Sequence, residues 1–182
     1  MQLLSFIRIF VWLLPLGCTL VLANAAVAAT SAELRSELVR QTVLDILSYT
    51  RWPSEPARLR LCITAPTEYA SSLLTIERQA NGRPVEVHRY DMGDEALIQR
   101  CDVIYLGVLA PAQRLSLFER LRGHAILSIS EQSRECIADA VFCLQAGEER
   151  GRFRVNLDAL ACSGVRVHPA VLKLARADEE VR

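Results

Sequence analysis

Apolar and polar positions alternate along this chain in two patterns, one with the period of a strand and one with the period of a helix. The strand-like runs are short and lie at residues 58–65, 85–90, 103–109, 125–130, 142–146 and 153–157. The helix-like segments lie between and around them, at residues 30–48, 68–79, 95–99, 112–121, 134–140, 156–161 and 169–175. Helices that alternate with strands predict an α/β sandwich, with a mostly parallel central sheet flanked by helices.

Several boundaries carry their own signals. Thr30 and Glu33 have the spacing of a capping box, which predicts the start of the first long helix. The Asn81-Gly82 pair predicts a turn. We expect the helix at 112–121 to turn three side chains inward, namely Leu115, Phe118 and Leu121. Gly147–Gly151 separates the last two strand-like runs, which predicts an antiparallel hairpin at one edge of the sheet.

The first 28 residues have the character of a secretion signal. Arg8 precedes an apolar stretch at residues 9–22, and Ala26-Val27-Ala28 resembles a cleavage site. The stretch is too short and too interrupted for a span of roughly 20 apolar residues. Lipidation at Cys18 is disfavoured because Pro15 stands where a leucine is expected. The sequence therefore predicts a cleaved signal at 1–28 and one mature domain at 29–182.

Charge excludes some partners of this mature domain. Of the 21 basic and 21 acidic residues, only Arg8 lies in the signal, which leaves 20 and 21 and a net charge near −1. A domain so balanced is not suited to bind nucleic acid or an anionic membrane surface. Its length of about 154 residues is enough for a hydrophobic core of its own.

Five cysteines remain in the mature chain, and in a secreted protein they indicate disulfides. Cys62 lies in the first strand and Cys101 leads into the third, and these strands can be neighbours in the sheet. Cys136 and Cys143 enclose a short loop. We prefer these two pairings, which would add about 4 and about 2.5 kcal/mol of stability, although five cysteines allow 15 arrangements of two bridges. Cys162 is then left as a small buried hydrophobic residue.

The sequence offers no set of catalytic residues. It lacks nucleophile-elbow, zinc-protease and phosphate-loop motifs. His88, His124 and His168 are too far apart in sequence to define a metal site, and no C-x-x-C motif is present. We therefore expect neither an enzyme nor a cofactor or metal.

A binding role has candidate residues. Arg51 precedes Trp52, and Arg166 and His168 alternate on an extended segment, so Arg51, Arg166 and His168 could hold a small aromatic anion or a nucleotide. The alternative is that Arg166 is an ordinary surface residue and His168 a helix cap. Trp52 and Phe142 could each be a partly exposed anchor for a protein partner or, equally, a core residue.

Several segments resemble the YfiR family. They are Leu47–Pro53, Val103–Gly107, Leu127–Ser130, Gly151–Leu157 and Ser163–His168, and the spacing of the two cysteine pairs agrees with them. The resemblance implies a periplasmic, dimeric and redox-sensitive repressor that binds the periplasmic sensor region of an inner-membrane diguanylate cyclase. Release of such a repressor raises cyclic di-GMP and promotes biofilm and exopolysaccharide production. The resemblance also favours the anchor role for Trp52 and Phe142 and the ligand role for Arg51, Arg166 and His168.

Three classes of function follow from the sequence. The first is a repressor that binds a membrane cyclase. The second is a periplasmic module that senses a small ligand, and the third is a secreted structural domain. A protein without catalytic groups acts only by binding, and it shifts its partner toward the state that it binds better. The repressor and the ligand sensor are therefore distinguished by whether the main partner is a protein or a small molecule.

Overall fold

The computed structural model describes residues 16–64, 66–131, 136, 140–145 and 152–176. Contacts divide the chain into two units, residues 1–34 and 35–182. Helix α2 (Leu16–Ser48) contributes to both. It is continuous through Thr30, so the predicted helix start at the capping box is wrong, while its predicted end at Ser48 is confirmed. The predicted signal lies partly outside the described residues, and its cleavage stays a prediction.

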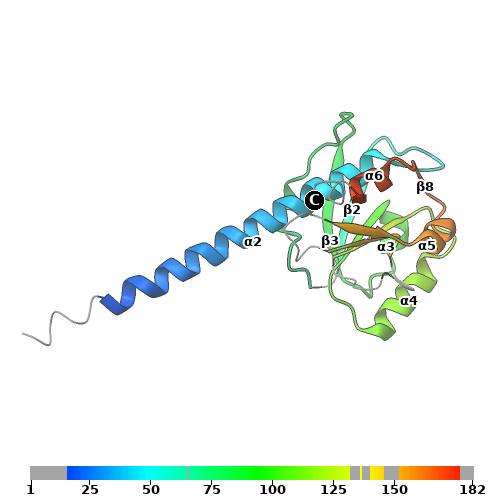
Figure 1. The fold of residues 1–182 in the computed structure, drawn as a ribbon. Coiled ribbons are helices and arrows are strands. Elements are labelled where there is room, and N and C mark those ends of the chain that lie inside the picture. The colour runs from blue at the N-terminus through cyan, green and yellow to red at the C-terminus, as the bar shows by residue number, and fades with distance from the viewer. Residues whose placement is uncertain (1–15, 65, 132–135, 137–139, 146–151, 177–182) are drawn as a thin grey trace, which may run out of the picture. The chain divides into compact units, whose positions relative to one another are not determined.

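A six-stranded sheet with the order β3-β2-β4-β5-β6-β7 forms the centre of the second unit. Strands β2 and β3 of this sheet are labelled in Figure 1. Its strands are β2 (Leu59–Thr64), β3 (Val85–Tyr90), β4 (Val103–Leu106), β5 (Leu127–Ser130), β6 (Phe142–Leu144) and β7 (Phe153–Val155). Every neighbouring pair is parallel except β6 and β7, which are antiparallel. The predicted α/β class, the parallel sheet and the edge hairpin are therefore confirmed. Gly147–Gly151, the expected turn of that hairpin, lies outside the described residues.

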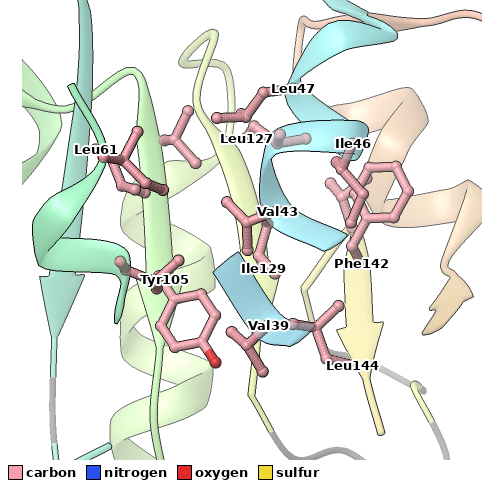
Figure 2. Packing of buried hydrophobic residues seen from close by; sticks show 14 of the residues in the cluster. Val39, Val43, Ile46, Leu47, Leu61, Tyr105, Leu127, Ile129, Phe142 and Leu144 are labelled. Atoms are coloured by element: carbon pink, nitrogen blue, oxygen red, sulfur yellow. The ribbon is translucent and has the colours of Figure 1, made fainter. Parts of the chain in front are cut away.

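One face of the sheet is covered by the C-terminal part of α2. Its side chains Val39, Val43, Ile46 and Leu47 are at most 2% exposed, and they pack on residues of β2, β4, β5 and β6 (Figure 2). The buried positions are spaced by three or four residues, as expected for the apolar stripe of a helix. This stripe is the contribution of α2 to the larger of the two hydrophobic cores, and it fixes where the C-terminal part of α2 packs on the sheet.

The opposite face is covered by α3 (Leu97–Arg100) and α4 (Pro111–Leu121). Helix α4 buries Leu117 and Leu121 and half-buries Phe118, whereas Leu115 is 60% exposed. The inward orientation predicted for Leu115 is therefore wrong. The sequence from Leu115 to Leu121 contains two overlapping apolar stripes, and packing against the sheet selects the one that contains Leu117.

The helix predicted at residues 68–79 is mostly absent. Only a short 3-10 turn, η1 (Ser71–Thr75), forms there. Instead, the Glu77 carbonyl accepts from the Val85 N–H, and the Gln79 N–H donates to the Arg83 carbonyl. These bonds cross the turn at Gly82, whose φ is +84°. These bonds across the turn use the backbone N–H and C=O groups that would otherwise form the hydrogen bonds of a longer helix.

The remaining elements close the domain. Strand β1 (Thr50–Arg51) pairs antiparallel with β8 (Arg166–Val167). Helices α5 (Leu157–Cys162) and α6 (Val171–Arg176) agree with the predicted helical segments. Asn156 caps α5, since its Oδ1 accepts from the Ala159 N–H at 3.0 Å. Most of the helix predicted at residues 134–140 and the tail at 177–182 lie outside the described residues.

Candidate functional site

The three residues predicted to bind a ligand lie together on the ribbon formed by β1 and β8. Arg51 and Arg166 are directly opposite each other in the antiparallel pair, so their side chains project from the same face. The His168 N–H donates to the carbonyl oxygen of Tyr49 at 2.9 Å, which extends the pairing beyond β8. All three predicted side chains are exposed. The ribbon therefore joins two segments that are more than a hundred residues apart in sequence.

The charges on this ribbon are unbalanced. Within the described residues, neither Arg51 nor Arg166 lies within ion-pair distance of a carboxylate. The Arg51 guanidinium instead donates to the carbonyls of Ser48 and Thr50 at 2.9 and 2.8 Å, at the negative end of α2. Like charges directly opposite each other are unfavourable in a sheet. The pair therefore forms a surface that an anion would stabilise.

Two contacts hold the imidazole ring of His168 in its orientation. Its Nδ1 accepts from the Ala170 N–H at 3.1 Å, and its ring centroid lies 6.3 Å from that of Tyr49. An acceptor at Nδ1 fixes the tautomer of a neutral ring, with the proton on Nε2. The helix-cap alternative for His168 thus corresponds to a contact that the structure shows, and this contact uses only Nδ1 of the ring.

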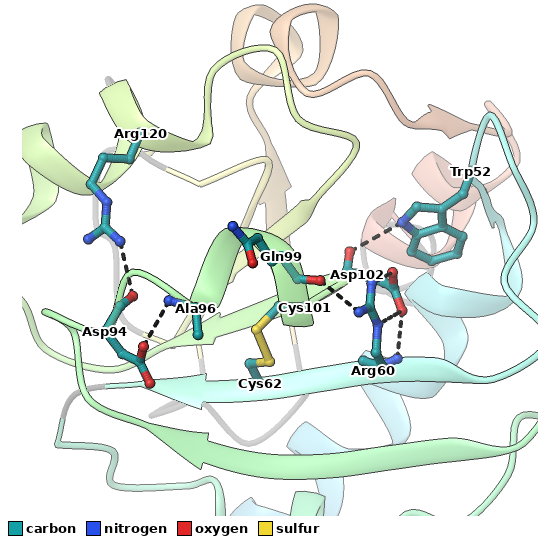
Figure 3. Close-up of a disulfide and its surroundings, with 9 residues drawn as sticks. All are labelled: Trp52, Arg60, Cys62, Asp94, Ala96, Gln99, Cys101, Asp102 and Arg120. Carbon is teal, nitrogen blue, oxygen red and sulfur yellow. Dashed lines mark hydrogen bonds and ion pairs between the residues drawn. A yellow bond between two sulfur atoms is a disulfide. The ribbon is translucent and has the colours of Figure 1, made fainter.

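Trp52, next to Arg51 in sequence, is a core residue. Its side chain is 6% exposed, and its Nε1 donates to the carbonyl oxygen of Asp102 at 3.2 Å (Figure 3). The Arg83 guanidinium lies 6.0 Å from the ring centroid and pairs with Glu55. The expectation of a partly exposed anchor is corrected, because the indole is covered and its only donor is satisfied inside the domain.

Asp102 is the polar centre of this region. Its carboxylate accepts from the backbone N–H of Arg60 at 2.8 Å and from the Arg60 guanidinium at 2.7 and 3.0 Å. The hydrogen bond that the Arg60 guanidinium donates to Asp102 is the main cause that holds the pKa of Arg60 above its usual value. Because Trp52 bonds to the Asp102 carbonyl, this ion pair also fixes the chain just after β1.

The disulfide between Cys62 and Cys101 adjoins this cluster (Figure 3). It joins the middle of β2 to the residue that precedes β4 by two positions, with the Cα atoms 5.8 Å apart. Both cysteines are at most 2% exposed. The preferred pairing and the predicted adjacency of the two strands are confirmed.

The second disulfide joins Cys136 to Cys143 in β6, as the preferred pairing has it. Cys136 has a φ of +52°, a left-handed conformation that costs a non-glycine residue about 1–2 kcal/mol. The Asn156 side chain donates to the Cys136 carbonyl at 3.1 Å. The bridge therefore ties a strained residue to the sheet, and Asn156 connects it to α5.

Phe142 lies beside this bridge and is fully buried. Its exposed fraction is 0%, and its ring makes an edge contact with Phe153, with the ring centroids 5.5 Å apart. Strand β6 lies between β5 and β7, so its neighbours hold Phe142 in place from both sides. The interpretation of Phe142 as an exposed ring for a partner is therefore corrected in favour of the core interpretation.

Cys162, which forms no disulfide, is exposed rather than buried. It lies at the end of α5 and lines a cavity of about 530 Å³ between α4 and α5, together with Cys136, Phe118 and Ala159. The prediction of a buried hydrophobic cysteine is wrong, because α5 has no fully buried residue.

The carboxyl ends of β2 and β4 are closed by the protein itself. In a parallel sheet, ligands commonly bind where neighbouring strands send their connections in opposite directions, and β2 and β4 are such a pair. Here the N–H groups of Gly107 and Val108 donate to the carbonyls of Thr64 and Pro66 at 3.1 and 3.0 Å. The two loops are thus bonded to each other where a ligand would enter.

Glu131, which sequence reasoning missed, lies at the same end of the sheet directly after β5. It is fully buried, and its carboxylate accepts from the backbone N–H groups of Glu68 and Tyr69. Burial raises its pKa to about 7, against the opposing effect of the two N–H donors. The signal available in the sequence was an acidic residue that follows a buried strand.

No group of metal-ligating side chains occurs among the residues that the structure describes. The same residues contain no helix long and apolar enough to cross a membrane.

Comparison with protein families gives a match over most of the chain. The family model for DUF4154, described as YfiR/HmsC-like, matches residues 36–176. This range contains both disulfides and the β1–β8 ribbon.

Proposed function

The chain belongs to the YfiR/HmsC-like family, and we propose on this basis that it is a periplasmic repressor of an inner-membrane diguanylate cyclase. It would bind the sensor region of the cyclase outside the cytoplasm and lower the production of cyclic di-GMP, and with it biofilm and exopolysaccharide output. Family membership carries this proposal. Two disulfides, which persist in oxidising compartments, support the location.

A repressor of this kind needs no chemistry of its own. It shifts the cyclase toward the state that it binds better, and only by its difference in affinity for the two states. A hundredfold preference for the inactive state corresponds to about 2.7 kcal/mol.

The direct test is to add the purified protein to the cyclase in membranes and measure the synthesis of cyclic di-GMP. We expect synthesis to fall as the protein is added, with the periplasmic domain of the cyclase competing for the protein and restoring activity. Unchanged synthesis at saturating protein would remove the repressor assignment for that cyclase.

Redox gating is part of the proposal, through the Cys136–Cys143 bridge. Reduction would release Cys136 from β6, and its left-handed backbone could then relax to an ordinary conformation. The change would affect the Cys136 segment and the Asn156 contact to α5. Phe142 would stay in place because β5 and β7 still hold β6. The homodimer implied by the family resemblance also stays a proposal.

A second candidate function is the recognition of a small anion. The arginines of the β1–β8 ribbon favour it, because neither pairs with a carboxylate among the described residues. Arg51 and Arg166 would hold a phosphate or carboxylate, and His168 and Tyr49 would flank an aromatic ring. Such a ligand could adjust the repressor or be the main signal.

We expect a nucleoside monophosphate or benzoate to raise the melting temperature of the protein through this ribbon. At a hundred times its dissociation constant, a ligand stabilises a protein by about 2.7 kcal/mol. The variants Arg166→Ala and His168→Ala should lose this shift, which differential scanning fluorimetry measures. Arg100→Ala, an exposed arginine at the end of α3, is the matched control and should keep it. A shift that survives in both ribbon variants would place the ligand elsewhere.

A further inference from the structure

Glu131 has an unusual environment for a carboxylate. It is fully buried, yet among the described residues it forms no ion pair. Its two oxygens accept instead from the Glu68 N–H, at 2.8 and 3.1 Å, and from the Tyr69 N–H. A buried charge without a cation is costly, and backbone donors offset only part of that cost.

The peptide group that Glu131 holds is connected to helix α2. Tyr69 donates its N–H to Glu131 and accepts at its carbonyl from the Ser36 hydroxyl, at 2.9 Å. Ser36 in turn accepts from the Ser72 N–H and the Ser71 hydroxyl, both at 2.8 Å. Residues 68–72 are thus clamped between the end of β5 and α2, with Glu131 on one side and Ser36 on the other.

The surrounding groups do not neutralise Glu131. The nearby Glu68 carboxylate disfavours its ionised form, and Arg89 of β3 favours it weakly. The Glu68 carboxylate is bonded to the Tyr69 hydroxyl, and Arg89 contacts Thr67 at 3.4 Å. On β4, the hydroxyl of the fully buried Tyr105 has no hydrogen-bond partner within the described ranges. On α2, the Arg35 side chain forms a hydrogen bond with the Tyr69 side chain.

We propose that Glu131 is a proton-operated latch, which holds residues 68–72 and the adjoining part of α2 closed when its carboxyl group is neutral and loosens them when it ionises. The neutral form avoids the cost of a buried charge, and its carbonyl oxygen still accepts from the backbone N–H groups. The charged form gains by reaching water, which requires the clamped segment to open. Loosening would expose the end of the sheet beneath α2.

The direction with pH follows from the pKa of about 7, which lies above the ordinary value of 4.5. Between these two values the closed state binds more protons than the open state, so closing is fully favoured below 4.5 and weakens as pH rises to 7. The opening equilibrium should therefore increase on the order of 50-fold between about pH 5 and about pH 8.

Amide hydrogen exchange of the purified protein tests this latch. The protection factors of the Glu68 and Tyr69 amides, corrected for intrinsic exchange, should fall on the order of 50-fold from about pH 5 to about pH 8. In Glu131→Gln they should not vary with pH, since glutamine keeps an acceptor and cannot ionise. Glu119→Gln, an exposed position on α4, is the matched control and should behave as the parent protein does.

Two results would overturn the latch. One is protection of these amides that does not change with pH in the parent protein, and the other is a pH dependence that persists in Glu131→Gln. Should that variant not fold, carbon NMR of the parent protein decides, because a Glu131 carboxyl titrating near 4.5 rather than near 7 contradicts the proposal. Both measurements use the chain alone, so their failure would leave the repressor assignment untouched.

Discussion

Replacing Cys62 and Cys101 together with alanine is expected to lower the free energy of unfolding by about 4 kcal/mol. The bridge spans 39 positions in sequence, so it removes much of the conformational freedom of the unfolded chain. It also joins two neighbouring strands at the centre of the sheet, where both cysteines are buried. Thermal unfolding should show a fall in melting temperature of about 12 °C, which urea titration would confirm as a free energy.

Cys162→Ala is the matched control for this double substitution. Cys162 is free and exposed, so its loss should change the free energy of unfolding by less than about 0.5 kcal/mol. A loss below about 1 kcal/mol in the double variant would show that strand pairing holds β2 and β4 without the bridge.

Gly107→Ala is expected to destabilise the domain by about 3 kcal/mol. A Cβ atom at this position would lie 1.9 Å from the carbonyl oxygen of Pro66 and 2.7 Å from its carbonyl carbon. The same oxygen accepts from the Val108 N–H, so the loop cannot move away without breaking that hydrogen bond. Thermal unfolding should show a fall of roughly 10 °C in melting temperature.

Gly93→Ala provides the comparison, because nothing lies within 4 Å of a Cβ atom built there. Its melting temperature should stay close to that of the parent protein. An unchanged melting temperature in Gly107→Ala would mean that the β2 and β4 loops are not closed on each other as described.

The sheet was predictable because each of its strands carries a local pattern. The alternation at Val85–Tyr90 and the continuous apolar run that begins at Val103 are typical of strands buried on one or both faces. The pairing of Cys62 with Cys101 was a preference among 15 arrangements, and it rested on the expectation that their strands can be neighbours in a parallel sheet. The predicted secretion signal was the reason to expect disulfides, because they form in oxidising compartments outside the cytoplasm.

Other features depended on tertiary contacts that a local pattern does not contain. The segment at residues 68–79 has helical periodicity. At one end, however, its backbone N–H groups donate to the side chains of Glu131 and Ser36. At the other end, the Gln79 N–H donates to the carbonyl oxygen of Arg83. Likewise, Trp52 and Phe142 have the residue types of interface anchors, and only the fold shows that they are buried.

The candidate site was predicted in part. Arg166 and His168 could be placed on one extended segment from their spacing, but the pairing of Arg166 with Arg51 depends on how the two ends of the domain meet. Glu131 was not predicted, because its partners are backbone N–H groups more than 60 residues away. A carboxylate that acts on the backbone leaves no partner motif in the sequence.

The measurement that tests the central claim most directly is calorimetric binding of the purified protein to the periplasmic domain of the membrane cyclase, with and without reductant. We predict a submicromolar complex with the oxidised protein and weaker binding after reduction of the Cys136–Cys143 bridge. Tight binding that is indifferent to reductant would keep the repressor and make the bridge purely structural. The absence of binding in both states would contradict the repressor assignment for that cyclase.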